Sequence, residues 1–197
     1  MVMFMKIYIT EDSALIIVDM QNDFMPGGAL PVKDADLIIP TINRYIKKFR
    51  EKGRPIYATR DWHPENHISF NTRGGPWPPH CIQGTKGAEF HKDLELSDDV
   101  IIVNKAYNPD RDAYSGFQET FLDIDLRRRG ISRIFVAGVA TEYCVKSTVI
   151  DGLNLGYEVI LLIDAIKGVD LNLGDSEKAI EDMLRRGAIL ATLDEVF

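Results

Sequence analysis

Three of the four histidines lie in one short segment, which follows an apolar run that ends in an aspartate: Asp61, His63, His67 and His80. Side chains along a strand alternate between its two faces, so Asp61 and His63 at a strand end would point to the same side. The proline-rich segment 74–81 would bring His80 back to them. Three protein ligands that leave a position open are typical of a working metal site. The alternative is a set of unrelated surface-loop histidines, which the scarcity of histidine elsewhere makes the weaker interpretation.

A second group of reactive side chains follows other apolar runs: Asp19, Lys105 and Cys144. Cys144 begins a predicted helix, whose positive end favours the thiolate form of a nucleophile. The small residues before it leave room for the N–H groups of Ala140 and Cys144 to form an oxyanion hole. Lys105 would hold the thiolate, and Asp19 would carry its proton. Taken singly, these are a small core residue, a surface charge and a turn residue, but their convergence favours chemistry.

The order of the predicted elements explains how the two groups of residues could come together. Apolar, β-branched runs that read as buried strands occur at 14–20, 55–61, 100–105, 133–139, 158–164 and 188–193. Amphipathic stretches that read as helices occur at 36–52, 116–129, 143–155 and 176–186. This alternation predicts an α/β fold of three layers, α/β/α, with a mostly parallel, six-stranded, Rossmann-like sheet. Ligands bind beyond the carboxyl ends of such strands, where the reactive residues lie, and the long loop 62–98 is of a kind that is usually functional.

The overall composition limits the number of domains, the partners and the cellular location that we expect. The 197 residues are 45% apolar, which predicts one domain over 1–197 with a full core. A net charge of −7 without a basic cluster makes nucleic acid and membrane surfaces poor partners. No apolar run approaches the ~18 residues of a membrane span, and Met1–Ile9 lacks the features of a signal peptide, so we expect a cytoplasmic protein. Two cysteines are too few for a disulfide framework.

Four segments together carry a resemblance to a known family: 18–24 (VDMQNDF), 61–63 (DWH), the isolated Lys105 and 138–145 (GVATEYCV). In this order, over nearly the whole chain, they resemble the isochorismatase-like cysteine hydrolases. The set Asp61, His63 and His80, with Trp77, resembles the nicotinamidase/pyrazinamidase branch in particular.

The resemblance implies a triad of Asp19, Lys105 and Cys144, and a cis peptide bond between Val139 and Ala140. It implies an amidohydrolase that acts on a linear amide and converts nicotinamide or pyrazinamide to the acid and ammonia through a Cys thioester, a step of NAD salvage. The metal ligands would be Asp61, His63 and His80, with Zn²⁺ as the ion, or else Fe²⁺ or Mn²⁺. The expected substrate contacts are Phe24, Trp77, Val139, Ala140 and Tyr143. The two aromatics Phe24 and Trp77 are candidates for sandwiching a flat ring.

Several alternatives stay open from the sequence. His67 is either a fourth ligand or, as we favour, a second-shell group that orients a metal-bound water. We expect Cys81 to be a buried structural thiol and His91 a surface residue. The fold would also suit another amide or carbamoyl substrate, a metal-binding scaffold without turnover, or a hydrolase in which zinc-bound water attacks directly. A homo-oligomer is compatible with the sequence.

Overall fold

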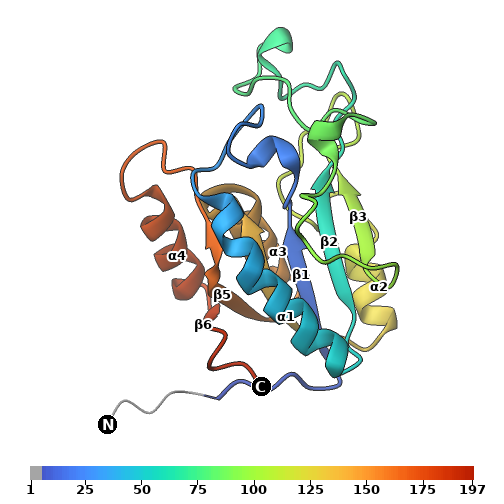
Figure 1. Ribbon diagram of the computed structural model, residues 1–197, viewed down its shortest axis with the longest axis vertical. Helices are drawn as coiled ribbons and strands as arrows, with labels where there is room; N and C mark the ends of the chain where they lie inside the picture. Colours follow the sequence, from blue (N-terminus) through green and yellow to red (C-terminus); the bar gives the residue numbers. More distant parts are fainter. Residues whose placement is uncertain (1–5) are drawn as a thin grey trace.

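The computed structural model of the protein describes residues 6–197 (Figure 1). The expectation about a signal peptide concerns Met1–Ile9, of which 1–5 lie outside the described residues. A six-stranded sheet has the order β3-β2-β1-β4-β5-β6, and every pairing in it is parallel. The strands are β1 (Ser13–Val18), β2 (Ile56–Asp61), β3 (Ile101–Lys105), β4 (Arg133–Val139), β5 (Glu158–Lys167) and β6 (Ile189–Ala191). Helices cover both faces, as the sequence predicts for a three-layer α/β fold.

Strand alternation divides the core into two clusters. In β1, Leu15 and Ile17 pack on the face covered by α1 (Ile39–Glu51), which the short turn η2 (Ala35–Ile38) precedes. The opposite face of β1 packs under three helices, α2 (Leu122–Arg128), α3 (Lys146–Asn154) and α4 (Asp175–Arg185). All six residues of β1 are buried. A strand buried on both faces requires a continuous apolar run, which is why the central strands lack polar alternation.

The predicted helix at 116–129 is wrong in its first half, because α2 begins only at Leu122. Glu119 has a φ of 55°, which interrupts helical geometry. Thr120 donates its hydroxyl to the Gly116 carbonyl at 2.6 Å and accepts the Leu122 N–H at 3.2 Å. A threonine that bonds to nearby backbone competes with helix formation, so the segment forms turns instead.

The sheet brings together the strand ends that carry the reactive residues. Because β1 lies between β2 and β4, the strand order reverses there, and such switch points are where open α/β sheets bind ligands. The loop 62–98 rises above these carboxyl ends and then returns past α1 to the start of β3 (Figure 1). It contains the short 3₁₀ turns η3 (Asn71–Arg73) and η4 (Lys86–Ala88). A third such turn, η1 (Asn22–Phe24), follows β1. Among residues 6–197, no helix is both long and apolar enough to cross a membrane.

Candidate active site

The three residues predicted as a triad meet at the ends of four neighbouring strands. Asp19 follows β1, Lys105 ends β3 beside Asp61 of β2, and Cys144 follows β4. Lys105 Nζ lies 2.9 Å from Asp19 Oδ2 and 3.4 Å from Cys144 Sγ, and it also hydrogen-bonds Asp61 Oδ1. Thr59 donates its hydroxyl to Asp19 Oδ1 at 2.7 Å. One buried cation therefore joins two carboxylates and a thiol.

One oxygen of Asp19 is paired with Lys105 without an aligned hydrogen bond. Oδ2 lies 2.9 Å from Lys105 Nζ in a buried ion pair, and it makes no hydrogen bond of good geometry within residues 6–197. Atoms of Asp19, Asp61 and Cys144 lie within 4.8 Å of one another. A carboxylate so close to a thiol can receive its proton during a reaction.

Burial sets the protonation of these groups. Burial raises the pKa of the Cys144 thiol well above its usual value, although Lys105 opposes the shift. Burial also raises the pKa of Asp19, against the opposing effect of Lys105. Lys105 itself remains charged, because Asp19 and Asp61 outweigh the effect of burial and raise its pKa. The sequence predicted a thiolate favoured by a helix end; in the structure, burial dominates, so loss of the thiol proton requires an acceptor such as Asp19.

Cys144 lies within a wide turn before α3. Residues Thr141–Val145 form one π-helical turn, so α3 begins two residues after Cys144 and not at 143. The Ala140 carbonyl accepts the N–H groups of Tyr143 and Val145 at 3.0 and 3.2 Å, which fixes this turn. The peptide bond between Val139 and Ala140 is cis, as the family resemblance implies.

The predicted metal ligands also converge. Donor atoms of Asp61, His63 and His80 lie within 4.8 Å of one another, and all three residues are buried. His63 Nδ1 donates to the His80 carbonyl at 2.9 Å, and His80 Nδ1 donates to the Pro78 carbonyl at 2.7 Å. Because a carbonyl only accepts, each ring donates from Nδ1, which leaves Nε2 as the atom that can bind a metal.

This donor set fits a transition metal. Burial lowers the pKa of His63 to about 4, so its imidazole is neutral near pH 7. Burial would raise the pKa of Asp61, but Lys105 and the two histidines hold it below its usual value. A carboxylate with two imidazoles is a ligand set suited to Zn²⁺, Fe²⁺ or Mn²⁺.

His67 lies beside these ligands without pointing a free nitrogen at them. Its ring centroid is 4.4 Å from that of His63. Its Nε2 donates to the Arg111 carbonyl at 3.0 Å, and its Nδ1 accepts from Ser69 Oγ at 2.7 Å. Both ring nitrogens are thus occupied, and the side chain connects the metal-bearing loop to the segment 107–114.

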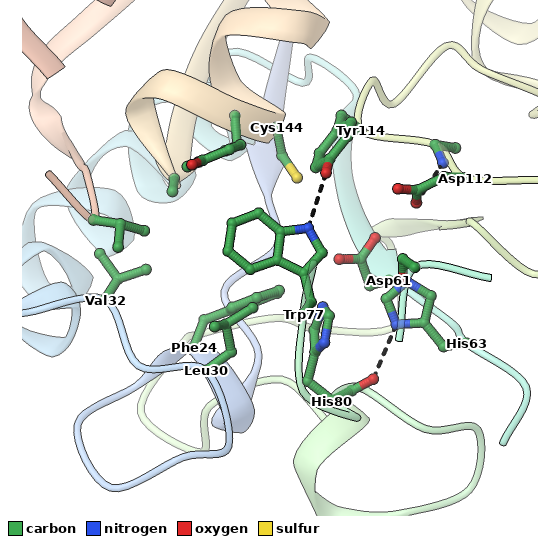
Figure 2. A pocket seen from close by; sticks show the side chains of 15 residues that line it. Phe24, Leu30, Val32, Asp61, His63, Trp77, His80, Asp112, Tyr114 and Cys144 are labelled. Carbon is green, nitrogen blue, oxygen red and sulfur yellow. Dashed lines mark hydrogen bonds between the residues drawn. The ribbon is translucent and has the colours of Figure 1, made fainter. Parts of the chain in front are cut away.

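A pocket opens directly over the thiol and the metal ligands (Figure 2). Of the substrate contacts predicted from sequence, Phe24, Trp77, Ala140 and Tyr143 line it. Val139, the fifth predicted contact, is not among the residues that line it: its side chain is fully buried in the core cluster that also contains Ala137 of the same strand. Side chains two apart in a strand share a face, so Val139 follows Ala137 into the core.

Six further pocket residues come from segments with no motif: Leu30, Val32, Asp112, Ala113, Tyr114 and Val169. Tyr114 accepts a hydrogen bond from Trp77 Nε1 at 2.9 Å, which fixes the indole across the pocket (Figure 2). The Asp112 carboxylate faces the metal ligands, with an oxygen within 4.8 Å of His63 and His67 donor atoms. These side chains belong to loops and turns, where periodicity carries no signal about orientation.

The remaining cysteine and histidine lie outside the pocket lining. Cys81 is fully buried, and burial raises the pKa of its thiol well above the usual value, as expected of a structural cysteine. His91 borders a separate groove with Asp93 and Asn43, and it is partly buried rather than a free surface residue.

Comparison with known proteins agrees with the fold and identifies the family. An isochorismatase domain matches residues 13–195. A nicotinamidase of Escherichia coli K12 is 39% identical over 91% of this chain and 94% of its own. The structure resembles the pyrazinamidase of Pyrococcus horikoshii in complex with zinc, at 56% identity, a TM-score of 0.89 and coverage of 92% and 99% of the two chains. It also resembles PnC1 from L. infantum in complex with nicotinate, at 34% identity, a TM-score of 0.90 and coverage of 98% and 99%. The resemblance in the sequence motifs is confirmed, and the chain belongs to the isochorismatase family, in the branch of the nicotinamidases and pyrazinamidases.

Proposed function

We propose that this protein is a nicotinamidase that hydrolyses nicotinamide to nicotinate and ammonia, and pyrazinamide to pyrazinoate and ammonia. The observation that carries the proposal is the contact of Cys144, Lys105 and Asp19 at the floor of a pocket whose wall holds Asp61, His63 and His80. A thiol with its proton acceptor, next to ligands for a metal that could bind a ring nitrogen, suits an aromatic carboxamide.

In the first half of the reaction, Asp19 Oδ2 takes the thiol proton, and the Cys144 sulfur adds to the carboxamide carbon. The tetrahedral intermediate collapses when its C–N bond breaks, and Asp19 returns the proton to the departing nitrogen, which leaves as ammonia. The raised pKa of Asp19 suits a group that must hold a proton between these two steps.

In the second half, water attacks the thioester carbon and gives its proton to Asp19. The C–S bond breaks, the acid leaves, and the sulfur is reprotonated. Lys105 remains charged throughout and stabilises each anion that forms beside it, whether carboxylate or thiolate. The N–H groups of Ala140 and Cys144 are our candidates to stabilise the oxyanion of both tetrahedral intermediates.

The aromatic side chains of the pocket and a metal on its ligands would orient the substrate. A bound Zn²⁺, or Fe²⁺ or Mn²⁺, on Asp61, His63 and His80 would supply a Lewis-acidic position for the pyridine nitrogen. Phe24 and Trp77, which line the pocket, would contact the faces of the ring, worth roughly 0.5–1.5 kcal/mol beyond burial. Holding the ring in one orientation places its carboxamide at the thiol.

An assay of ammonia release with nicotinamide, pyrazinamide and benzamide tests this function. Benzamide has the same shape without a ring nitrogen, so we expect about a hundredfold lower kcat/KM, equivalent to about 2.7 kcal/mol and within the range of a lost charged hydrogen bond. Equal rates for all three would remove the metal from recognition. No activity on any of them would favour another amide or a carbamoyl substrate, and activity in Cys144→Ala would favour attack by metal-bound water.

A further inference from the structure

The Asp23 carboxylate reaches into the metal-bearing loop from the turn after β1. Asp23 Oδ2 accepts the N–H of Cys81 at 2.7 Å, and Oδ1 lies 3.3 Å from the Ala29 N–H. Gly87 packs against this carboxylate so closely that a Cβ there would lie 2.2 Å from Oδ2. The surrounding chain is thus shaped to hold the carboxylate in place, although Asp23 belongs to neither the triad nor the ligand set.

The peptide group that Asp23 contacts is shared with two metal ligands. Its N–H belongs to Cys81, and its carbonyl belongs to His80, the third ligand. That same carbonyl accepts the Nδ1–H of His63 at 2.9 Å. A continuous line of hydrogen bonds therefore runs from the Asp23 carboxylate through one peptide group to the imidazole of His63.

Asp23 also stabilises an unfavourable backbone conformation. Cys81 has a φ of 48°, in the left-handed region that residues other than glycine rarely adopt. Its N–H bond to Asp23 holds this conformation directly after His80. Loss of the bond would free the His80–Cys81 peptide to rotate, which would turn both His80 and the acceptor of His63.

We propose that Asp23 is a positioning residue of the metal centre, which acts through the His80–Cys81 peptide group on both histidine ligands. Carboxylates commonly accept a hydrogen bond from a ligating histidine directly, which orients the ring and strengthens the ligand. Here one peptide group stands between them, and hydrogen bonds in such a line polarise one another. The carboxylate thereby fixes the direction of His80 and increases the electron density at His63 Nε2.

The neighbouring Gln21 holds the remaining ligand, Asp61, in a parallel way. Its fully buried amide donates to the Asp61 carbonyl at 2.8 Å and accepts the Asp61 N–H at 2.8 Å. The turn after β1 therefore contacts the backbone of both metal-bearing segments, two and four residues after the proton acceptor Asp19. This one short segment therefore sets the position of the proton acceptor relative to the metal ligands.

Zinc affinity, measured by chelator competition on the purified protein, tests the role of Asp23 without using turnover. We expect Asp23→Ala to weaken zinc binding 10–100-fold, the usual effect of removing a partner of a ligand. Asp23→Asn keeps an oxygen acceptor and loses the charge, so it should recover much of this loss. NMR of the zinc-loaded protein should show the His63 Nδ1–H signal shifted in Asp23→Asn and exchanging faster in Asp23→Ala.

The matched control is Asp175→Ala, which removes another aspartate that accepts a loop N–H, that of Asn172 at 3.0 Å, and that is not among the residues lining the pocket. It should leave zinc affinity unchanged. If Asp23→Ala, or Asp23→Asn should the alanine variant not fold, binds zinc as the unmodified protein does with an unchanged His63 signal, Asp23 has no role in the metal centre. This inference rests on the metal site of the proposed function: an unmodified protein that binds none of Zn²⁺, Fe²⁺ and Mn²⁺ would overturn both, whereas unchanged affinity in the Asp23 variants overturns this inference alone.

Discussion

Lys105 holds the site together at the scale of single residues. Its ammonium group is fully buried and lies between the carboxylates of Asp19 and Asp61. A buried ion pair contributes little net stability when complete, but removing one partner leaves an uncompensated charge in the interior. Here two carboxylates would remain face to face. We therefore expect Lys105 to stabilise the fold as well as to take part in the proposed reaction.

We predict that Lys105→Met, which keeps the side-chain length and removes the charge, lowers the free energy of unfolding of the metal-free protein by about 3–5 kcal/mol. Urea denaturation measures this. The double variant with Asp19→Asn should recover part of the loss, because one buried carboxylate is then neutral. Equal stability of Lys105→Met and the unmodified protein would show that the charge is not needed by the fold.

The two cysteines should behave differently. Both thiols are buried and both have raised pKa values, but only Cys144 lines the pocket and contacts Lys105. We predict that Cys144→Ala abolishes turnover and keeps the metal, whereas Cys81→Ser retains most activity. Mass spectrometry after iodoacetamide treatment should show Cys144 labelled first and protected by nicotinate. Labelling of Cys81 first would contradict this assignment.

His63 should make the metal-free protein sensitive to acid. Burial lowers its pKa to about 4 in the folded state, against an ordinary value of 6.5 in the unfolded chain. Between these values the unfolded state binds more protons, so the contribution of His63 to stability is complete above pH 6.5 and falls as pH drops toward 4, by about 3 kcal/mol.

Denaturation of the metal-free protein between pH 4 and 7 measures this slope. His63→Gln should flatten the slope by that amount, whereas His91→Gln, a change outside the pocket lining, should keep it. An equal slope in the His63 variant and the unmodified protein would rule out a buried neutral imidazole at this position.

At the scale of elements, the strands were predictable and several connections were not. Each predicted strand matches an observed strand to within a few residues, because a central parallel strand must be apolar on both faces. The strand ends then identified Asp19, Asp61, Lys105 and Cys144 as neighbours. Other features depend on details that apolar periodicity does not reveal. The helix at 116–129 is shortened by a threonine that bonds nearby backbone, and the burial of Val139 follows from its register in β4.

The loop 107–114 is the clearest case of a feature that sequence reasoning missed. It brings Asp112 and Tyr114 into the pocket, although it has neither periodicity nor a motif. Its position depends on distant partners in the loop after β2. These are the His67 ring, which bonds the Arg111 carbonyl, and Arg73, which bonds the Pro109 carbonyl at 3.0 Å. Such long-range bonds appear only after the sheet has brought the two loops together.

We predict that His67→Ala keeps the bound metal and loosens this loop, because both nitrogens of His67 serve hydrogen bonds. Amide hydrogen exchange should rise in 108–114, and KM should increase several-fold more than kcat falls. Arg73→Ala is the matched control, since it removes an exposed contact to the same loop and should have a smaller effect. Loss of the metal in His67→Ala would make His67 a fourth ligand instead.

At the scale of the whole molecule, the site and the fold share one framework. The ligands and the triad come from the ends of β1, β2, β3 and β4 and from the loop 62–98, so a metal bound there joins segments far apart in sequence. Anything that binds only the folded state stabilises it by mass action. We propose that 1–197 is one cooperative domain, in which site and sheet unfold together.

Both tryptophans, Trp62 and Trp77, lie in the loop 62–98, so fluorescence reports on the site while circular dichroism reports on the helices and strands. We predict that the two signals give one coincident unfolding transition in the metal-free protein, as expected of a single cooperative unit. Zinc at a hundred times its dissociation constant should raise the free energy of unfolding by about 2.7 kcal/mol in both signals equally, with no effect expected from Mg²⁺. A fluorescence transition that precedes the loss of helical signal, and that zinc alone shifts, would mean that the loop unfolds independently of the sheet.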